Sequence, residues 1–187
     1  MSPSLADRLL EARHNRFVGR EGELSVFESA LRADVLPFYI LHIYGPGGVG
    51  KTTLLQEFSL LSVRYEARSI YLDARHIDLS PDAFLNALGI LWGQNNSASI
   101  TDLLEASPQR TVILIDTYEA LTPLDPWLRT TLLPQLPDTV LTVFARRNPP
   151  DMAWQGDSGW LEINSVDHFS ISKADRAHDS PTLFNHR

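Results

Sequence analysis

Cysteine is absent from this chain of 187 residues. Its absence excludes disulfide bonds, thiolate metal sites and cysteine nucleophiles. No apolar run approaches the roughly 20 residues that a membrane-spanning helix needs, and residues 1–16 lack the continuous apolar core of a signal peptide. We therefore expect a cytoplasmic protein that has no membrane partner.

Lysine is nearly absent as well. Of the 16 basic residues only Lys51 and Lys173 are lysine, and 23 acidic residues bring the net charge to −7. An acidic chain repels a phosphate backbone, which argues against nucleic acid as the main partner of this segment. Because the chain otherwise uses arginine, a lysine in a defined motif indicates a need for a compact point charge.

Lys51 lies in a glycine-rich segment, residues 45–52, that has the pattern G-x-x-x-x-G-K-[ST]. An apolar run precedes this segment and an amphipathic stretch follows it, which is the strand–loop–helix context of a phosphate-binding loop. The alternative is a glycine turn before a helix with an accidental lysine. The residues that we expect to bind a nucleotide's phosphates are Gly45, Pro46, Gly47, Gly48, Val49, Gly50, Lys51, Thr52 and Thr53.

The chemistry of such a loop assigns different tasks to its backbone and its side chains. Backbone N–H groups wrap the phosphates, and the N-terminus of the following helix adds a favourable dipole. Lys51 would place its ammonium on the outer phosphates and stabilise charge there during catalysis, and the Thr52 hydroxyl would hold Mg²⁺.

Short apolar runs alternate with amphipathic stretches along the chain. Strands are predicted near residues 38–44, 69–73, 111–116, 139–144 and 160–163. Helices are predicted before residue 15, at about 21–33 and 51–63, from about 81, and near 100–106 and 126–133. This alternation predicts an α/β fold, a three-layer α/β/α sandwich around a parallel sheet.

Asp116 follows the fully apolar run 111–115, so we expect it at the carboxyl end of a buried strand. Open α/β sheets bind ligands at these strand ends, and an Asp beside a phosphate-binding loop holds the water shell of Mg²⁺. The alternative is that Asp116 caps the helix that follows. We interpret Asp116 as the second metal-binding residue, together with Thr52.

Two further charged residues are candidates for catalysis. Glu119 follows Asp116 by three residues and could orient or deprotonate a water in line with the γ-phosphate; alternatively, it only begins a helix, where acids are favoured. Arg146, at the end of the strand near 139–144, could contact the γ-phosphate and stabilise developing charge. The alternative for Arg146 and its neighbour Arg147 is a solvated basic pair.

Several segments together resemble a known family, the STAND ATPases and their AAA-type relatives. Members include bacterial signalling ATPases, transcription regulators of the maltose-activator type, and plant and animal immune receptors. The similar segments are residues 17–24 (FVGREGEL), the phosphate-binding loop, residues 114–121 (LIDTYEAL), and residues 143–150 (VFARRNPP) followed by Trp154. They occur in the family's order and span roughly Phe17 to Phe169.

The resemblance implies a sheet order of 5-1-4-3-2 and a nucleotide, ATP or ADP, bound with Mg²⁺. It also implies that Phe17 and Val18 lie against the adenine with Arg20 near the same edge, although an aromatic and a β-branched residue before a helix could equally form a hydrophobic staple. Residues 1–169 would be the ATPase core, with 1–36 as its helical N-terminal segment. Residues 170–187 would be a polar tail or the start of a truncated lid.

The sequence departs from the family at two places. Many relatives carry an acid directly after the strand Asp, where this chain has Thr117, and relatives continue into a helical lid beyond the core. We expect a slow, nucleotide-dependent switch ATPase that works with protein partners or by self-association. The alternatives are a nucleotide-binding interaction module without turnover and an origin-binding-type ATPase that contacts DNA.

Overall fold

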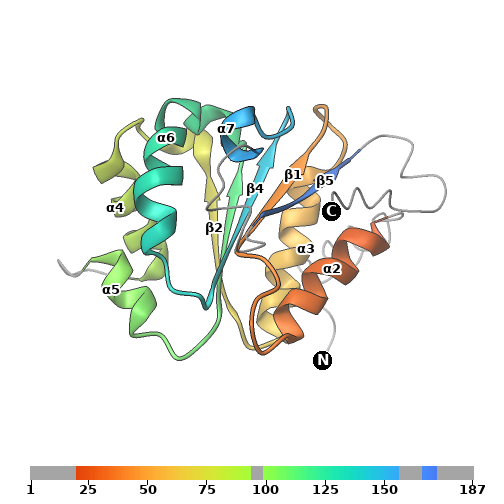
Figure 1. The fold of residues 1–187 in the computed structure, drawn as a ribbon, viewed down its shortest axis with the longest axis horizontal. Coiled ribbons are helices and arrows are strands. Elements are labelled where there is room, and N and C mark those ends of the chain that lie inside the picture. The colour runs from red at the N-terminus through yellow and green to blue at the C-terminus, as the bar shows by residue number, and fades with distance from the viewer. Residues whose placement is uncertain (1–19, 94–98, 156–165, 172–187) are drawn as a thin grey trace, which may run out of the picture.

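The computed structural model describes residues 20–93, 99–155 and 166–171. Its centre is a sheet of five parallel strands in the order β2-β3-β4-β1-β5 (Figure 1). The strands are β1 (Ile40–Tyr44), β2 (Arg68–Asp73), β3 (Thr111–Asp116), β4 (Val140–Arg146) and β5 (Val166–Ser170). Read from the other edge this is 5-1-4-3-2, so the expected fold class and strand order are confirmed.

Helices cover both faces of the sheet. On one face lie α2 (Glu21–Arg32) and α3 (Lys51–Arg64), and the other face carries α4 (Pro81–Trp92), α5 (Ile100–Glu105) and α6 (Asp125–Trp127) (Figure 1). The short elements are η1 (Ala74–His76), η2 (Tyr118–Leu124), η3 (Leu128–Leu132), η4 (Leu133–Gln135) and α7 (Met152–Gln155). No helix among the described residues is both long and apolar enough to cross a membrane.

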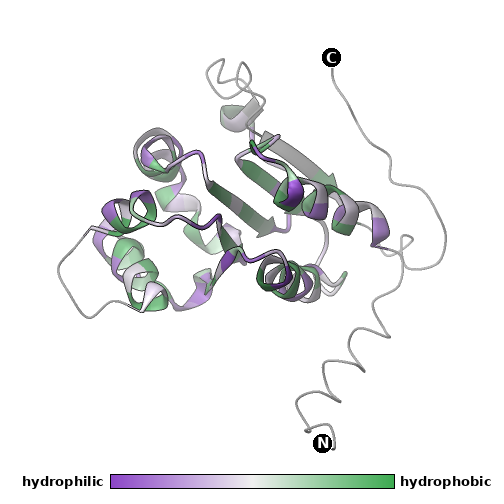
Figure 2. Ribbon diagram, turned by 90° about the horizontal axis from the view of Figure 1, so that it is seen from below, coloured by the Kyte–Doolittle hydropathy of each residue, from purple (hydrophilic) through white to green (hydrophobic). Residues whose placement is uncertain are grey.

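Alternating side chains divide the interior into two cores. In β3, which is buried throughout, Val112 and Leu114 belong to the core under α2 and α3. Ile113 and Ile115 belong to the core under α4 and α5. This follows from the two-residue period of a strand, and it explains why the central strands are apolar on both faces. Figure 2 shows this hydrophobic colouring on the sheet between the helices.

Most element boundaries agree with the sequence-based expectation to within two residues, but the fifth strand does not. The stretch 160–163 lies outside the described residues, and β5 begins at Val166 instead. In the described sheet β5 is an edge strand paired with β1, and its sequence (VDHFS) is mixed rather than continuously apolar. The helix expected before residue 15 also lies outside the described residues.

Ile171, the residue directly after β5, packs against the start of the glycine-rich loop. The amide of Ile171 donates to the carbonyl of Tyr44 at 2.7 Å, and Ile171 is buried. A Cβ atom at Gly45 would lie 2.1 Å from the carbonyl oxygen of Ile171. Glycine at position 45 is therefore required by the close approach of another backbone segment.

We predict that Gly45→Ala destabilises the protein by about 1–3 kcal/mol, because the added methyl group meets backbone that cannot move aside without disturbing β5. Gly47→Ala is the matched control, since nothing lies within 4 Å of the place that its added Cβ atom would take. That change should stay within about 0.5 kcal/mol. Urea unfolding measures both, and equal stability of the two variants would contradict the prediction.

Candidate functional site

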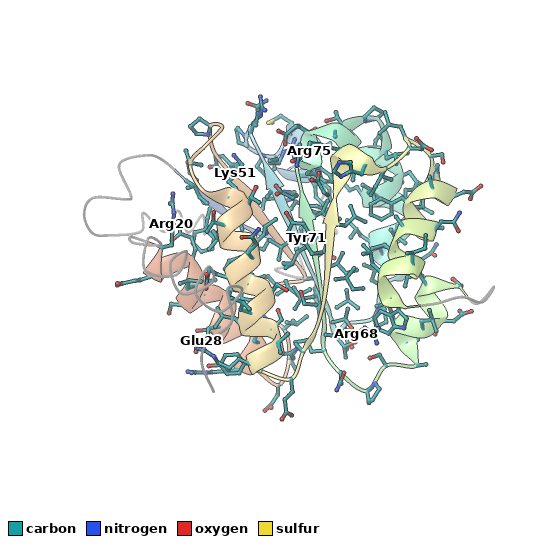
Figure 3. The ribbon with its side chains drawn as sticks, turned by 180° about the vertical axis from the view of Figure 1, so that it is seen from behind. Arg20, Glu28, Lys51, Arg68, Tyr71 and Arg75 are labelled. Carbon is teal, nitrogen blue, oxygen red and sulfur yellow. The ribbon has the colours of Figure 1, made fainter. Side chains whose placement is uncertain are left out.

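The candidate residues gather at the carboxyl ends of the parallel strands. The glycine-rich loop follows β1, Asp116 ends β3, and Arg146 ends β4, which lies between β1 and β3. Figure 3 shows Lys51 and Arg75 toward this end of the molecule, and Arg68 and Glu28 toward the other. Ligands of open parallel sheets bind at this edge.

The loop has the backbone geometry of an anion cradle. Gly48 and Gly50 have φ of 75° and 99°, in the left-handed region that glycine tolerates best. Gly50 is the N-cap of α3 and provides no side chain to bind the first-turn amides, which leaves those donors available to a ligand. The loop therefore offers backbone N–H groups and a helix dipole to a phosphate chain.

Lys51 lies against the loop itself. Its Nζ donates to the carbonyls of Gly45 at 2.6 Å and Pro46 at 3.0 Å. Partial burial lowers the pKa of Lys51 from its usual value, an effect opposed by the carboxylates of Glu119 and Asp116 and reinforced by Arg147. These charged groups therefore lie close enough to Lys51 to influence its charge, as a shared site requires.

Asp116 connects the loop helix to the sheet. It is 4% exposed, and its Oδ2 accepts hydrogen bonds from Thr52 Oγ1 at 2.7 Å and from Tyr71 OH at 2.8 Å. Its Oδ1 accepts from the amide of Thr117 at 2.8 Å. A hydroxyl and a carboxylate in contact are the oxygen donors that Mg²⁺ prefers, so Thr52 and Asp116 fit the metal that the sequence implied.

Thr117 turns the chain sharply after β3. Its φ of 54° and ψ of 43° are left-handed, and η2 begins at the next residue. The turn brings Glu119 to Arg147, whose Nε lies 3.0 Å from Glu119 Oε1. The other oxygen, Oε2, is buried without a hydrogen-bond partner in the described part of the chain. The role of Glu119 in orienting water stays a prediction.

The side chain of Arg146 lies on the face of the sheet that carries Tyr118 and the core under α4 and α5. It is 8% exposed, and its guanidinium lies over the ring of Tyr118, 5.3 Å from the ring centre. Its Nε and Nη1 are buried and have no hydrogen-bond partner among the described residues. Its neighbour Arg147 is the arginine that is paired with Glu119. The contact of Arg146 with a γ-phosphate stays a prediction.

Arg20 supports the loop from the N-terminal segment. Its guanidinium is 3% exposed and donates to Glu23 Oε1 and to the carbonyl of Val49, each at 3.1 Å. These bonds tie the start of α2 to the glycine-rich loop. Phe17 and Val18, expected with Arg20 at the adenine, lie outside the described residues.

Sequence reasoning missed a buried polar group beneath η2. Asp125 accepts from Tyr118 OH at 2.5 Å and from Trp154 Nε1 at 2.9 Å. Burial, and then the bond to Asp125, raise the pKa of the Tyr118 phenol, so it stays a donor at neutral pH. The group fixes η2, which carries Glu119, to α7 after β4. Trp154 is 29 residues from Asp125 in the sequence, and Asp125 belongs to none of the sequence motifs.

Tyr71 is a further residue that sequence reasoning missed. One sequence feature could have pointed to it. Tyr71 lies two residues before Asp73, the last residue of β2, so the side chain of Tyr71 is on the same face of the strand as this strand-end acid. The register of β2 with β3 could not be read from the sequence. In the structure Asp73 pairs with Asp116, and Tyr71 reaches the same carboxylate.

No protein-family model and no curated protein matches this chain. Several solved structures share its fold. They include Cdc6p from Pyrobaculum aerophilum (17% identity, TM-score 0.58, covering 80% of this chain and 44% of that one). Drosophila ORC bound to DNA aligns at 16% identity and a TM-score of 0.64, and the alignment covers 86% of this chain and 44% of that one. The Aeropyrum pernix ORC1 protein in complex with DNA aligns at 19% identity and a TM-score of 0.57, and the alignment covers 83% of this chain and 46% of that one.

These likenesses show the fold. The shared fold is a sheet of five parallel strands with helices on both faces, and in this chain the glycine-rich loop follows β1 and Asp116 ends β3. The chain spans less than half the length of the structures named above.

We predict that Tyr118→Phe lowers the free energy of unfolding by about 1–3 kcal/mol, because it removes one of two donors to a buried carboxylate. Tyr65→Phe removes a phenol that bonds Arg32 and Glu28 at a more exposed place, and should cost less than about 1 kcal/mol. Urea unfolding followed by circular dichroism compares the two. A larger loss in the Tyr65 variant would contradict the prediction.

Proposed function

We propose that this chain binds ATP together with Mg²⁺, hydrolyses it slowly, and serves as the nucleotide-dependent core of a switch ATPase. The observation that carries the proposal is the 2.7 Å bond between Thr52 and Asp116, because it joins the phosphate-binding loop to the acidic strand end. Lys51 lies beside both. Phosphoryl transfer needs mainly such positioning and charge neutralisation.

Each residue has a defined task in this proposal. The loop amides hold the phosphate chain, and Lys51 exchanges its bonds to the loop carbonyls for the outer phosphates. Thr52 and Asp116 would hold Mg²⁺, which neutralises charge on the phosphate oxygens when bound. Glu119 would orient the attacking water, and the pair Arg146 and Arg147 supplies positive charge at the end of β4.

The finer assignment rests on the resemblance of the motifs to STAND ATPases. It includes preference for ATP, adenine contacts of Phe17 and Val18, a signalling or transcription-regulating role, protein partners or self-association, and a cytoplasmic location. Slow turnover is expected because Thr117 stands where many relatives carry an acid.

A nucleotide-binding interaction module without turnover is the second candidate. Two observations favour it: the hydroxyl residue Thr117 follows Asp116, and Glu119 is engaged by Arg147 at 3.0 Å. DNA contact has less support. Two of the similar structures are DNA complexes, but at 16% and 19% identity they inform on the fold, and this chain carries a net charge of −7.

We predict that Lys51→Ala weakens Mg²⁺–ATP binding by at least about a hundredfold, because the ammonium at the outer phosphates is lost. Arg64→Ala is the matched control, since Arg64 is an exposed cation at the opposite end of the same helix. Isothermal titration calorimetry on folded variants measures both. Unchanged affinity in the Lys51 variant would refute nucleotide binding at this loop.

Turnover separates the two candidate functions. If the chain is an ATPase, Glu119→Gln should lower phosphate release by about a hundredfold while ATP still binds, because the amide cannot accept a proton from water. Glu105→Gln, an exposed acid at the end of α5, is the control and should leave the rate unchanged. Wild-type protein that binds ATP without releasing phosphate would support the module instead.

A further inference from the structure

We propose that Tyr71 is a positioning residue for the metal-binding carboxylate: its hydroxyl holds Asp116 in the orientation that a nucleotide-bound Mg²⁺ requires. The inference rests on the proposed function and adds a residue that none of the motifs contains. Tyr71 lies in the middle of β2, on the strand next to the one that carries Asp116 (Figure 3).

The geometry places two hydroxyl groups on one carboxylate oxygen. Thr52 reaches Asp116 Oδ2 from the loop helix at 2.7 Å, and Tyr71 reaches the same oxygen from β2 at 2.8 Å. The third donor is the amide of Thr117, on Oδ1 at 2.8 Å. The carboxylate is thus held from three directions, by α3, by β2 and by its own backbone turn.

The number of acceptor positions then limits what Asp116 can bind. A carboxylate offers about four lone-pair positions, two on each oxygen. The two hydroxyls occupy those of Oδ2 and the amide occupies one on Oδ1, so one position on Oδ1 is left among the described contacts. Asp116 can therefore give a metal-bound water one defined acceptor, and without Tyr71 the carboxylate would be freer to rotate.

The neighbours of Tyr71 leave Asp116 as its acceptor. Asp73, which pairs with Asp116 across the two strands, is bound by Arg75 through contacts of 2.6 and 2.9 Å. Arg75 lowers the pKa of Asp73, so that acid stays ionised and paired. The Tyr71 hydroxyl instead donates to Asp116 Oδ2 at 2.8 Å.

Calorimetry of Tyr71→Phe tests the proposal, because phenylalanine keeps the ring that packs on the core and removes only the hydroxyl. ATP is titrated once with Mg²⁺ and once with EDTA. The measured quantity is the affinity for ATP with Mg²⁺ divided by the affinity for ATP in EDTA. We expect this Mg²⁺ ratio to fall roughly tenfold in the variant, as it does for other groups that orient a metal ligand. The affinity in EDTA should change less than about twofold. Tyr65→Phe, a phenol at the far end of α3, should leave the ratio unchanged.

A double-mutant cycle with Asp116→Asn shows whether Tyr71 acts through that carboxylate. In the Asp116→Asn background the added Tyr71→Phe change should leave the Mg²⁺ ratio unaltered. An unaltered ratio in the single Tyr71 variant, or equal losses with Mg²⁺ and EDTA, would overturn the proposal while leaving nucleotide binding intact. Absence of ATP binding by the wild-type protein would instead refute the proposed function, and this inference with it.

Discussion

The hydrogen bonds to the carboxylate of Asp116 are the constraint on which the site depends. Thr52 belongs to the first turn of α3, Tyr71 to β2 and Asp116 to the end of β3, so three elements meet at one buried charge. A charge that is 4% exposed is tolerated only when donors compensate for the water it has lost, and here two hydroxyls and an amide do so. The helix that follows the glycine-rich loop is fixed to the sheet at this point, which gives the loop a defined place.

The two cores of the sheet serve different parts of the site. The core under α2 and α3 positions the phosphate-binding loop, with Arg20 adding a bond to the Val49 carbonyl. The core on the other face holds η2 through Tyr118, Asp125 and Trp154, and so positions Glu119. The candidate binding groups and the candidate catalytic Glu119 therefore rest on different cores of the sheet. A change in one core should affect mainly one of the two functions.

The sequence was sufficient for the parts of the site that depend on local pattern. A glycine-rich loop between an apolar run and an amphipathic stretch, and an acid ending a buried strand, predicted where Lys51, Thr52 and Asp116 would lie. It was insufficient where the answer depends on register between strands or on contacts across the fold. Tyr71 reaches Asp116 because β2 and β3 pair Asp73 with Asp116, and Asp125 meets Trp154 across 29 residues. The edge strand β5 begins later in the sequence than expected, at Val166. The sequence did not indicate this position because an edge strand needs no continuous apolar run.

The consecutive arginines at the end of β4 show how strand geometry separates two similar side chains. Phe144 and Arg146 lie on the face of Tyr118 and Trp154, whereas Ala145 lies in the core of α2 and α3. Because the side chains of a strand alternate, adjacent arginines cannot both turn to the same face while the strand continues. The strand ends at Arg146, which frees Arg147 to meet Glu119 at 3.0 Å. Arg146 thus lies over the ring of Tyr118 in η2, and Arg147 forms an ion pair with Glu119. The two positive charges, adjacent in sequence, therefore have different partners in the fold.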